Sequence, residues 1–272
     1  FERWTQDNYY GIGAFFNRVQ RKASNDANEM IVWVARAGEV TQPRTGQTMS
    51  PWLPLTGTAE AEAEVDRRQL LVDWLISPDN PFFAKAEVNR TWGYLMGRGI
   101  VEPVDDFRAS NPPSNKALLD GLAEHFVSSG YDRKDLIRTI TASRTYQASA
   151  QTNELNRDDT KYFSPATTRM LSAEQLLDAI CQVTGVVETY AGLPPGTRAT
   201  QLPSPDIDHS FLKVFGQPAR EMACECERSD DSNLSQALQM INGELVHRKL
   251  TDESNRLRSL AEMPDDQIVT KL

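Results

Sequence analysis

The chain has few residues of the kinds that most often carry chemistry. It contains only three cysteines and three histidines in 272 residues. Three cysteines are too few for a disulfide scaffold at this length, so the core must hold the fold. No CxxCH motif is present, which excludes covalent attachment of a c-type haem within this chain. The isolated histidines match no usual zinc or di-iron spacing, and we expect no metal site and no cofactor here.

The chain also lacks a basic excess and a long apolar run. Its 38 acidic and 29 basic residues give a net charge of -9, which repels a phosphate backbone and predicts no nucleic-acid partner. No apolar run approaches the roughly 20 residues that cross a bilayer, and the first residues, FERWTQDNYY, lack a signal-peptide pattern. We expect no membrane span. The 39% hydrophobic content suffices for one large domain or two smaller ones.

Most of the chain has the apolar spacing and the start and stop residues of helices. The helices on the two sides of Pro78 are expected to form a hairpin. The expected helices are 9–22 after Asp7, 59–77, 81–96 after Asp79 or Asn80, 115–129 after Ser114, 133–143 after Asp132, a helix reaching 185 after the Ser172–Gln175 capping box, 233–242 after Ser232, and another from Glu244.

Two segments depart from this helical pattern. Residues 30–40, MIVWVARAGEV, are rich in β-branched and aromatic residues and precede a turn-like Pro43–Gly46 segment, so they are the best strand or hairpin candidate. Residues 186–231 form a long excursion that contains proline and glycine, and it is either functional or held onto the body by its own contacts. The predicted fold is mainly α: a helical bundle with a small β-hairpin element near the N-terminal side and a long irregular excursion.

The most distinctive segment is residues 79–114, which combine helix punctuation, aromatics and many polar residues. It has no nucleophile beside a base and no phosphate-binding glycine loop. Six polar residues here and at the end of a later helix are expected to converge: Asn89, Arg90, Asp105, Asp106, Arg144 and Tyr146. In the structural interpretation, one arginine pairs with an aspartate and fixes the connection after Gly99 onto the bundle. In the functional interpretation, the carboxylates are a general acid and base or a polar ligand site.

A second group of polar residues follows two cysteines. In an extended segment Cys224 and Cys226 lie on one face about 6.6 Å apart, near the upper limit of Cα separation for a disulfide, so a bridge is feasible but strained. Either can instead bridge to Cys181, or all three can be small buried hydrophobic residues. Glu227 and Arg228 come directly afterwards and are added to the candidate polar cluster.

Four motifs occur in order along the chain: DNPFFAKAEVNRTWGYLMGRGIVEPVDDF, LIRTITASRTYQ, RMLSAEQLLDAI and CECERSDDSNLSQALQMIN. Together they resemble the uncharacterised C-terminal, PSD-type domain of unknown function of large planctomycete proteins. Those proteins often carry a cytochrome c-like haem domain and a second uncharacterised domain before this one. The resemblance covers residues 51–250, with residues 1–50 as the tail of the preceding domain and residues 251–272 as a C-terminal helical tail.

The resemblance implies a fragment of a multi-domain protein that is exported to the periplasm or cell surface. Any haem would lie in a region before this chain, and the preceding domains of the same polypeptide are the expected partners. We therefore interpret the chain as a non-haem binding or scaffolding module of a larger exported cytochrome c-like protein.

Two alternatives belong to other classes. One is a hydrolase acting on polysaccharide, with Asp105 and Asp106 or Glu227 as acid and base, and with Trp52 available for sugar stacking. The other is a docking surface for a redox partner, expected to be an exposed apolar patch with an acidic rim. An enzyme should place at least two of these carboxylates around an open cleft, whereas a scaffold should bury each against an arginine.

Overall fold

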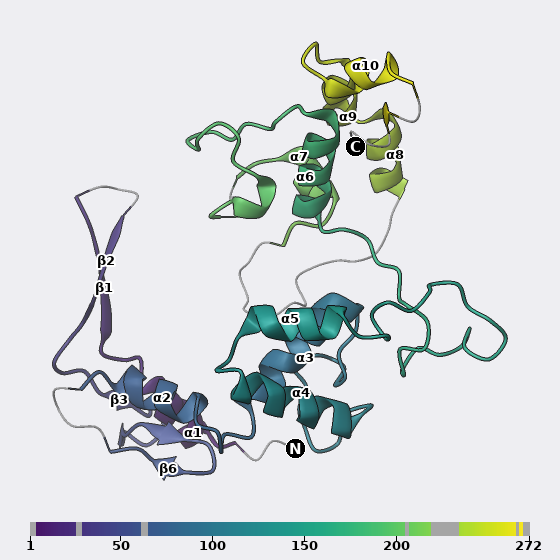
Figure 1. The fold of residues 1–272 in the computed structure, drawn as a ribbon. Helices are drawn as coiled ribbons and strands as arrows, with labels where there is room; N and C mark the ends of the chain where they lie inside the picture. The colour runs from purple at the N-terminus through teal and green to yellow at the C-terminus, as the bar shows by residue number, and fades with distance from the viewer. Residues whose placement is uncertain are drawn as a thin grey trace. The chain divides into compact units, whose positions relative to one another are not determined.

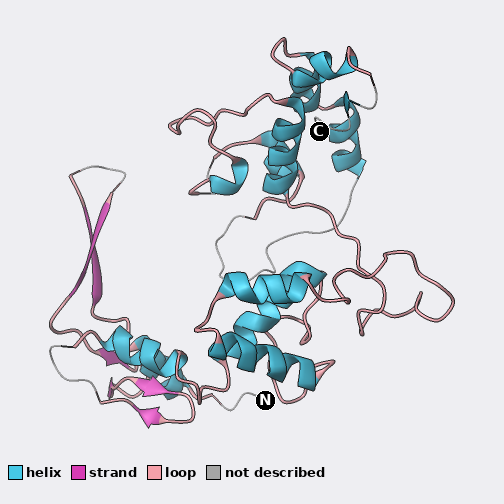
Figure 2. Ribbon diagram, viewed as in Figure 1, coloured by secondary structure: helices cyan, strands magenta, loops and turns pink. Residues whose placement is uncertain are grey.

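The computed structural model describes residues 4–25, 29–60, 65–204, 207–218, 234–264 and 267–268. It divides into two compact units, Phe1–Thr167 and Thr168–Leu272, which are described separately (Figure 1). Helices form most of the regular structure and the strands are short antiparallel pairs (Figure 2), so the mainly α prediction is confirmed at this level. The division between the two units, at Thr167, differs from the domain boundaries expected at residues 50 and 250. Those boundaries rest on the family resemblance and stay a prediction.

The first unit opens with a short helix, α1 (Gln6–Gly13). Its cap is Thr5, which forms a capping box with Asn8, and not the predicted Asp7. The predicted continuation of this helix to residue 22 is wrong, because Val19–Ala23 is strand β1. Pairing with a β-branched partner strand distant in sequence overrides the local helical spacing there.

Three two-stranded antiparallel sheets follow, as the predicted β element near the N-terminal side required. Strand β1 pairs with β2 (Met30–Val34) in a register that places Val19 opposite Val34. The other pairs are β3 (Val40–Thr41) with β4 (Thr48–Met49), and β5 (Trp52–Leu53) with β6 (Gly57–Thr58). In the turn between β3 and β4, the Gln42 side chain accepts hydrogen bonds from two backbone N–H groups.

One carboxylate ties this β region to the next helix. Glu39 accepts hydrogen bonds from Arg18, at the start of the β1–β2 hairpin, and from both terminal nitrogens of Arg67, at distances of 2.8–2.9 Å. The Arg67 side chain is only 10% exposed. Arg67 is the first residue of α2 (Arg67–Leu75), which is capped by Asp66. The predicted helix from residue 59 began too early, because residues 59–60 and 65–66 are not helical and α2 begins at Arg67.

The core of the first unit is formed by three helices, α3 (Phe83–Met96), α4 (Lys116–Ser128) and α5 (Arg133–Thr141). α3 packs mainly against α4 and α5, and not against α2 as the predicted helical hairpin required. The reason is that α2 buries none of its residues, whereas α3 presents a buried apolar stripe. That stripe consists of Ala84, Val88, Trp92 and Met96.

One of the three predicted caps is correct, since Asp132 accepts hydrogen bonds from the first backbone N–H groups of α5. The N-cap of α3 is Phe82 and not the predicted Asp79 or Asn80, although Asn80 Oδ1 accepts from the N–H groups of Phe82 and Phe83 just before and at the start of the helix. The cap of α4 is Asn115 rather than the predicted Ser114, whose hydroxyl donates instead to the Ile100 carbonyl. Gly97 ends α3 with a left-handed conformation, φ 78°.

The second unit is built on α6 (Ala173–Thr184), which opens with the predicted Ser172–Gln175 capping box. The described part of the long excursion contains a 3₁₀ turn and a short helix, and their apolar residues are buried in the core, so contacts hold it onto the body. The elements that follow α6 are η1 (Ala199–Gln201), α7 (Ser210–Val214), α8 (Leu234–Asn242), α9 (Glu244–Thr251) and α10 (Arg256–Ala261).

Candidate functional site

The buried amide of Asn89 fixes the connection that follows α3. Asn89 is fully buried, and its Nδ2 donates to the carbonyls of Val101 and Val104 at 2.9 and 2.8 Å. Its Oδ1 accepts from the Val101 N–H at 2.9 Å. The connection itself turns so tightly that a Cβ on Gly99 would overlap the Val101 carbonyl oxygen. The Asn89 side chain therefore supplies the hydrogen bonds that the backbone of this loop would otherwise make within a helix or sheet.

Both aspartates of the signature are held by arginines. Arg90 Nε lies 2.7 Å from Asp105 Oδ1, so one of the pairs considered in the structural interpretation is present. The pair is about half exposed, at 51% and 40%, and not buried. Asp106 pairs with its near neighbour Arg108 at 2.6 Å, and this guanidinium holds the pKa of Asp106 below its usual range. Asp106 is thus a carboxylate at neutral pH, which does not suit a general acid.

Arg144 and Tyr146 lie beyond the end of α5, in a turn closed by the Tyr146 N–H and the Ser143 hydroxyl. Both are exposed, and within the described residues no hydrogen bond, ion pair or ring contact joins them to either aspartate. The structure therefore brings together Asn89, Arg90 and the turn, but not this later segment. Cys224, Cys226, Glu227 and Arg228 lie outside the described residues.

Trp52, the candidate sugar-stacking residue, lies in strand β5 and is partly buried against Gly11 of α1. Its ring meets that of Trp4 edge to face, with centroids 5.5 Å apart. Trp4 is half exposed. The more accessible indole of this pair is therefore Trp4 and not Trp52.

The second unit contains a buried ion pair that the sequence did not indicate. Lys249 of α9 is 1% exposed, and its Nζ lies 3.0 Å from Glu188 Oε2 and donates to the Val186 carbonyl at 2.9 Å. Arg248 adds a second contact to Glu188 at 2.9 Å. Burial raises the pKa of Glu188, but the two cations outweigh burial and lower it overall. The cluster anchors the segment after α6 onto α9.

A buried tyrosine and a partly buried histidine lie near this ion pair. The rings of Tyr190 and His209 are 5.9 Å apart. Burial, reinforced by neighbouring acidic groups, raises the pKa of Tyr190, and its hydroxyl has no hydrogen-bond partner in the part of the chain that the structure describes. His209 Nδ1 accepts from the Leu212 N–H and caps α7, and burial lowers the pKa of His209. Both side chains are therefore uncharged at neutral pH.

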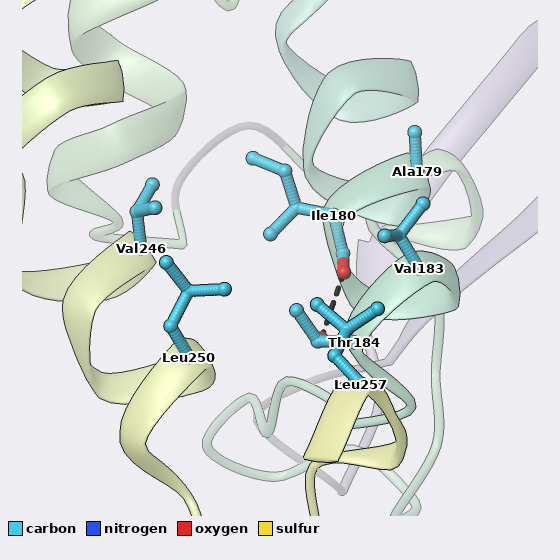
Figure 3. Close-up of a pocket in the computed structure, with 7 residues that line it drawn as sticks. All are labelled: Ala179, Ile180, Val183, Thr184, Val246, Leu250 and Leu257. Atoms are coloured by element: carbon cyan, nitrogen blue, oxygen red, sulfur yellow. Dashed lines mark hydrogen bonds between the residues drawn. The ribbon is translucent and has the colours of Figure 1, made fainter. Parts of the chain in front are cut away.

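An apolar hollow of about 240 Å³ lies between α6, α9 and α10 (Figure 3). The hydroxyl of its one polar lining residue, Thr184, donates to the Ile180 carbonyl on its own helix at 2.8 Å. The hollow therefore suits apolar groups and offers no acid, base or nucleophile. It is lined by Ala179, Ile180, Val183, Thr184, Val246, Leu250 and Leu257.

Across the described ranges, no three histidine, cysteine, aspartate or glutamate side chains gather as they would around a metal ion. In the same ranges, no helix is long and apolar enough to cross a membrane. Cys181 is partly buried and forms no disulfide within the residues that the structure describes.

Comparison with protein families matches residues 67–271 to PSD1, described as a protein of unknown function (DUF1553). The chain belongs to the PSD1 family. No curated protein and no solved structure matches the chain. The PSD1 match starts at the first residue of α2, so it includes the signature turn and the Lys249–Glu188 pair but excludes all three β pairs.

Two features of the PSD1 domain were missed in the sequence. Lys249 stands in a helix with polar neighbours, where a lysine is ordinarily a solvated residue. Only its position on the same face as Leu245, four residues earlier, marks it as inward-facing, and that signal is weak. The closeness of Gly99 to the Val101 carbonyl also has no local sequence signal.

Proposed function

We propose that this chain is a non-haem binding or scaffolding module of a larger exported protein, and that it docks through the β1–β2 hairpin. The proposal assigns any haem to another part of the polypeptide, because the chain has no CxxCH motif. The expected partners are other domains of the same polypeptide. The planctomycete origin, export and the cytochrome c-like context rest on the resemblance of the four ordered motifs.

The observation that carries the proposal is the exposure of strand β2. All five residues from Met30 to Val34 are large and apolar, and each is 41–61% exposed. A two-stranded hairpin is marginally stable alone in water, and contiguous exposed apolar surface marks an interaction site. The hairpin also lies outside the residues that match PSD1.

The two faces of the hairpin differ. Residues opposite each other in an antiparallel pair share a face, so the register places Val19, Ala23, Met30, Val32 and Val34 on one side with Arg21. We refer to this side as the apolar face. On the other side, Lys22 Nζ lies 5.7 Å from the ring centre of Trp33 and partly covers it. The apolar face is therefore the better docking surface.

The geometry favours this function over the two alternatives. A hydrolase needs a carboxyl group that can be protonated near a free carboxylate, whereas Asp105 and Asp106 are each paired with an arginine; Glu227, the other candidate, lies outside the described residues. A redox docking surface was expected to have an acidic rim, but the described strands of the hairpin carry only the cations Arg21 and Lys22.

A photo-crosslinking residue placed at Val32 of the native protein in its own cells tests the docking function. We expect crosslinks from this position to another domain of the same polypeptide, identified by mass spectrometry of the crosslinked peptides. The matched control is Leu155, a loop residue that is 97% exposed and should crosslink only at background level. Equal yields at Val32 and Leu155 would refute docking through the hairpin.

A further inference from the structure

We propose that two copies of this chain pair through the open edge of β2 and form a four-stranded antiparallel sheet about a two-fold axis at Val32. The inference rests on the proposed function, since it takes the β1–β2 hairpin as the docking element. It adds that the partner at the backbone edge of β2 is a second copy of the chain. The side-chain face and the backbone edge are separate surfaces, so one hairpin can use both.

Two backbone hydrogen bonds show which groups of β2 point outward. The Ala35 N–H donates to the Arg18 carbonyl at 2.7 Å, and the Ser24 N–H donates to the Glu29 carbonyl at 3.2 Å. Both bonds join residues that are directly opposite in the register. Hydrogen-bonded and non-hydrogen-bonded pairs alternate along an antiparallel ribbon.

The two bonds involve Glu29 and Ala35, and the pattern repeats every two residues. The odd-numbered residues of β2 therefore direct their N–H and C=O groups toward β1. Met30, Val32 and Val34 therefore direct theirs away from it. Within the described residues, β2 has no second neighbouring strand, and no backbone bond joins these three residues to another segment. The open edge of β2 thus offers three regularly spaced donor and acceptor groups, which is what an added strand requires.

The spacing of these groups makes the edge self-complementary. A two-fold axis at Val32 places Val32 opposite its own copy and Met30 opposite Val34 of the partner subunit. Each of these is a hydrogen-bonded pair, so every outward group of the three residues finds a partner. On the other face, the same register sets Ile31 opposite Trp33 of the partner subunit, a β-branched and aromatic pair of the stabilising kind.

The charges on the hairpin select this edge over the other. β2 carries no charged residue, whereas β1 carries Arg21 and Lys22. Pairing through β1, or stacking the two apolar faces, would bring like charges together, and edge lysines are a common protection against pairing. Pairing through β2 leaves both cationic strands on the outside of the sheet. A second copy is therefore a partner that this edge fits without repulsion.

Sedimentation velocity of the purified chain tests the pairing across concentrations from about 5 to about 500 μM, because a short seam should give a weak dimer. We expect a monomer–dimer equilibrium. Val32→Pro removes an outward N–H but no bond within the hairpin, and it should raise the dissociation constant at least about tenfold. Val32→Thr keeps the N–H and the β-branched shape, so the dimer should persist.

A covalent test does not depend on the proline variant folding. In the proposed sheet, Val32→Cys brings two thiols together across the axis, with Cα atoms about 5.5 Å apart, within disulfide range. Mild oxidation should give a disulfide-linked dimer, whereas Val19→Cys on the outer strand should not. A wild-type chain that stays monomeric over the whole range, or equal dimer yields from the two cysteine variants, would overturn the inference. A monomeric chain that still crosslinks at Val32 to another domain of its own polypeptide would refute the self-pairing and leave the docking function standing.

Discussion

Replacing Asn89 with alanine should destabilise the first unit more than truncating any other polar side chain of the signature segment. The amide serves three backbone groups, the buried N–H and C=O of Val101 and the partly buried C=O of Val104. Each hydrogen bond contributes about 1 kcal/mol, and a buried group left unpaired costs about 1–3 kcal/mol. Some of these groups would regain water, so we expect Asn89→Ala to lower the free energy of unfolding by about 3–4 kcal/mol.

The neighbouring residue supplies the control. Arg90 has a longer side chain and a charge, but its ion pair with Asp105 is half exposed, and exposed pairs contribute about 0–1 kcal/mol. Arg90→Ala should therefore cost no more than about 1 kcal/mol. If Arg90→Ala proved as costly as Asn89→Ala, the account of the signature as a loop held by a buried amide would be wrong.

Urea unfolding followed by tryptophan fluorescence measures the difference. All five tryptophans lie between residues 4 and 92, so the signal reports the first unit alone. With a urea dependence of about 2 kcal/mol per M, the expected loss lowers the midpoint by about 1.5–2 M for Asn89→Ala and by no more than about 0.5 M for Arg90→Ala.

Three further predictions concern single residues. Hydrogen bonds from Arg67 and Arg18 lower the pKa of Glu39 in the folded protein. The stability that the ionised Glu39 gives the fold is therefore complete above the unfolded pKa of about 4.3, and it is lost as pH falls through the lower pKa of the folded state. Glu39→Gln should reduce the loss of urea resistance between pH 5 and pH 3, and an unchanged slope would contradict the ion-pair assignment. Burial lowers the pKa of His209, so the unfolded state binds the proton more readily, and stability is complete above about pH 6.5 and declines below it. His209→Asn keeps a capping side chain that does not titrate, and circular dichroism melts should show a flatter dependence between pH 5 and pH 7; equal slopes would argue against it. Gly99→Ala should lower the melting temperature, because a Cβ there overlaps the Val101 carbonyl oxygen. Gly121→Ala should raise stability by about 0.5–1 kcal/mol, because this helical glycine has open space around it. A higher melting temperature for Gly99→Ala than for Gly121→Ala would contradict the overlap at Gly99.

Local signals made much of the helical structure predictable. The Ser172–Gln175 capping box, the Asp132 cap and the left-handed Gly97 depend on neighbours within a few residues, and these elements begin or end where the sequence indicated. The first helix was overextended because Val19 lies opposite Val34, a contact with no local signal. The expected hairpin between α2 and α3 failed because sequence spacing does not show which helices share a core.

The candidate site was predictable to the same degree. The contact between Arg90 and Asp105 was predictable, because Arg90 lies on a helix and Asp105 lies on the short connection that folds back over that helix. Arg144 depended on the direction in which the chain leaves α5, which its sequence does not fix. Lys249 and Glu188 come from separate segments, and only the packing of α9 on α6 brings them together.

The position of Glu39 has a practical consequence for dividing the protein. The PSD1 match begins at Arg67, and this invites expression of the domain from that residue onward. A protein cut there would lose Glu39 while keeping Arg67, whose guanidinium is held by that carboxylate in the intact chain. The opening turn of α2 would then begin with an arginine deprived of its counter-ion, at the helix end where a positive charge is least favourable. An expressed PSD1 domain should therefore start before residue 39, and the natural limit of the folded domain lies well ahead of the limit that family similarity draws.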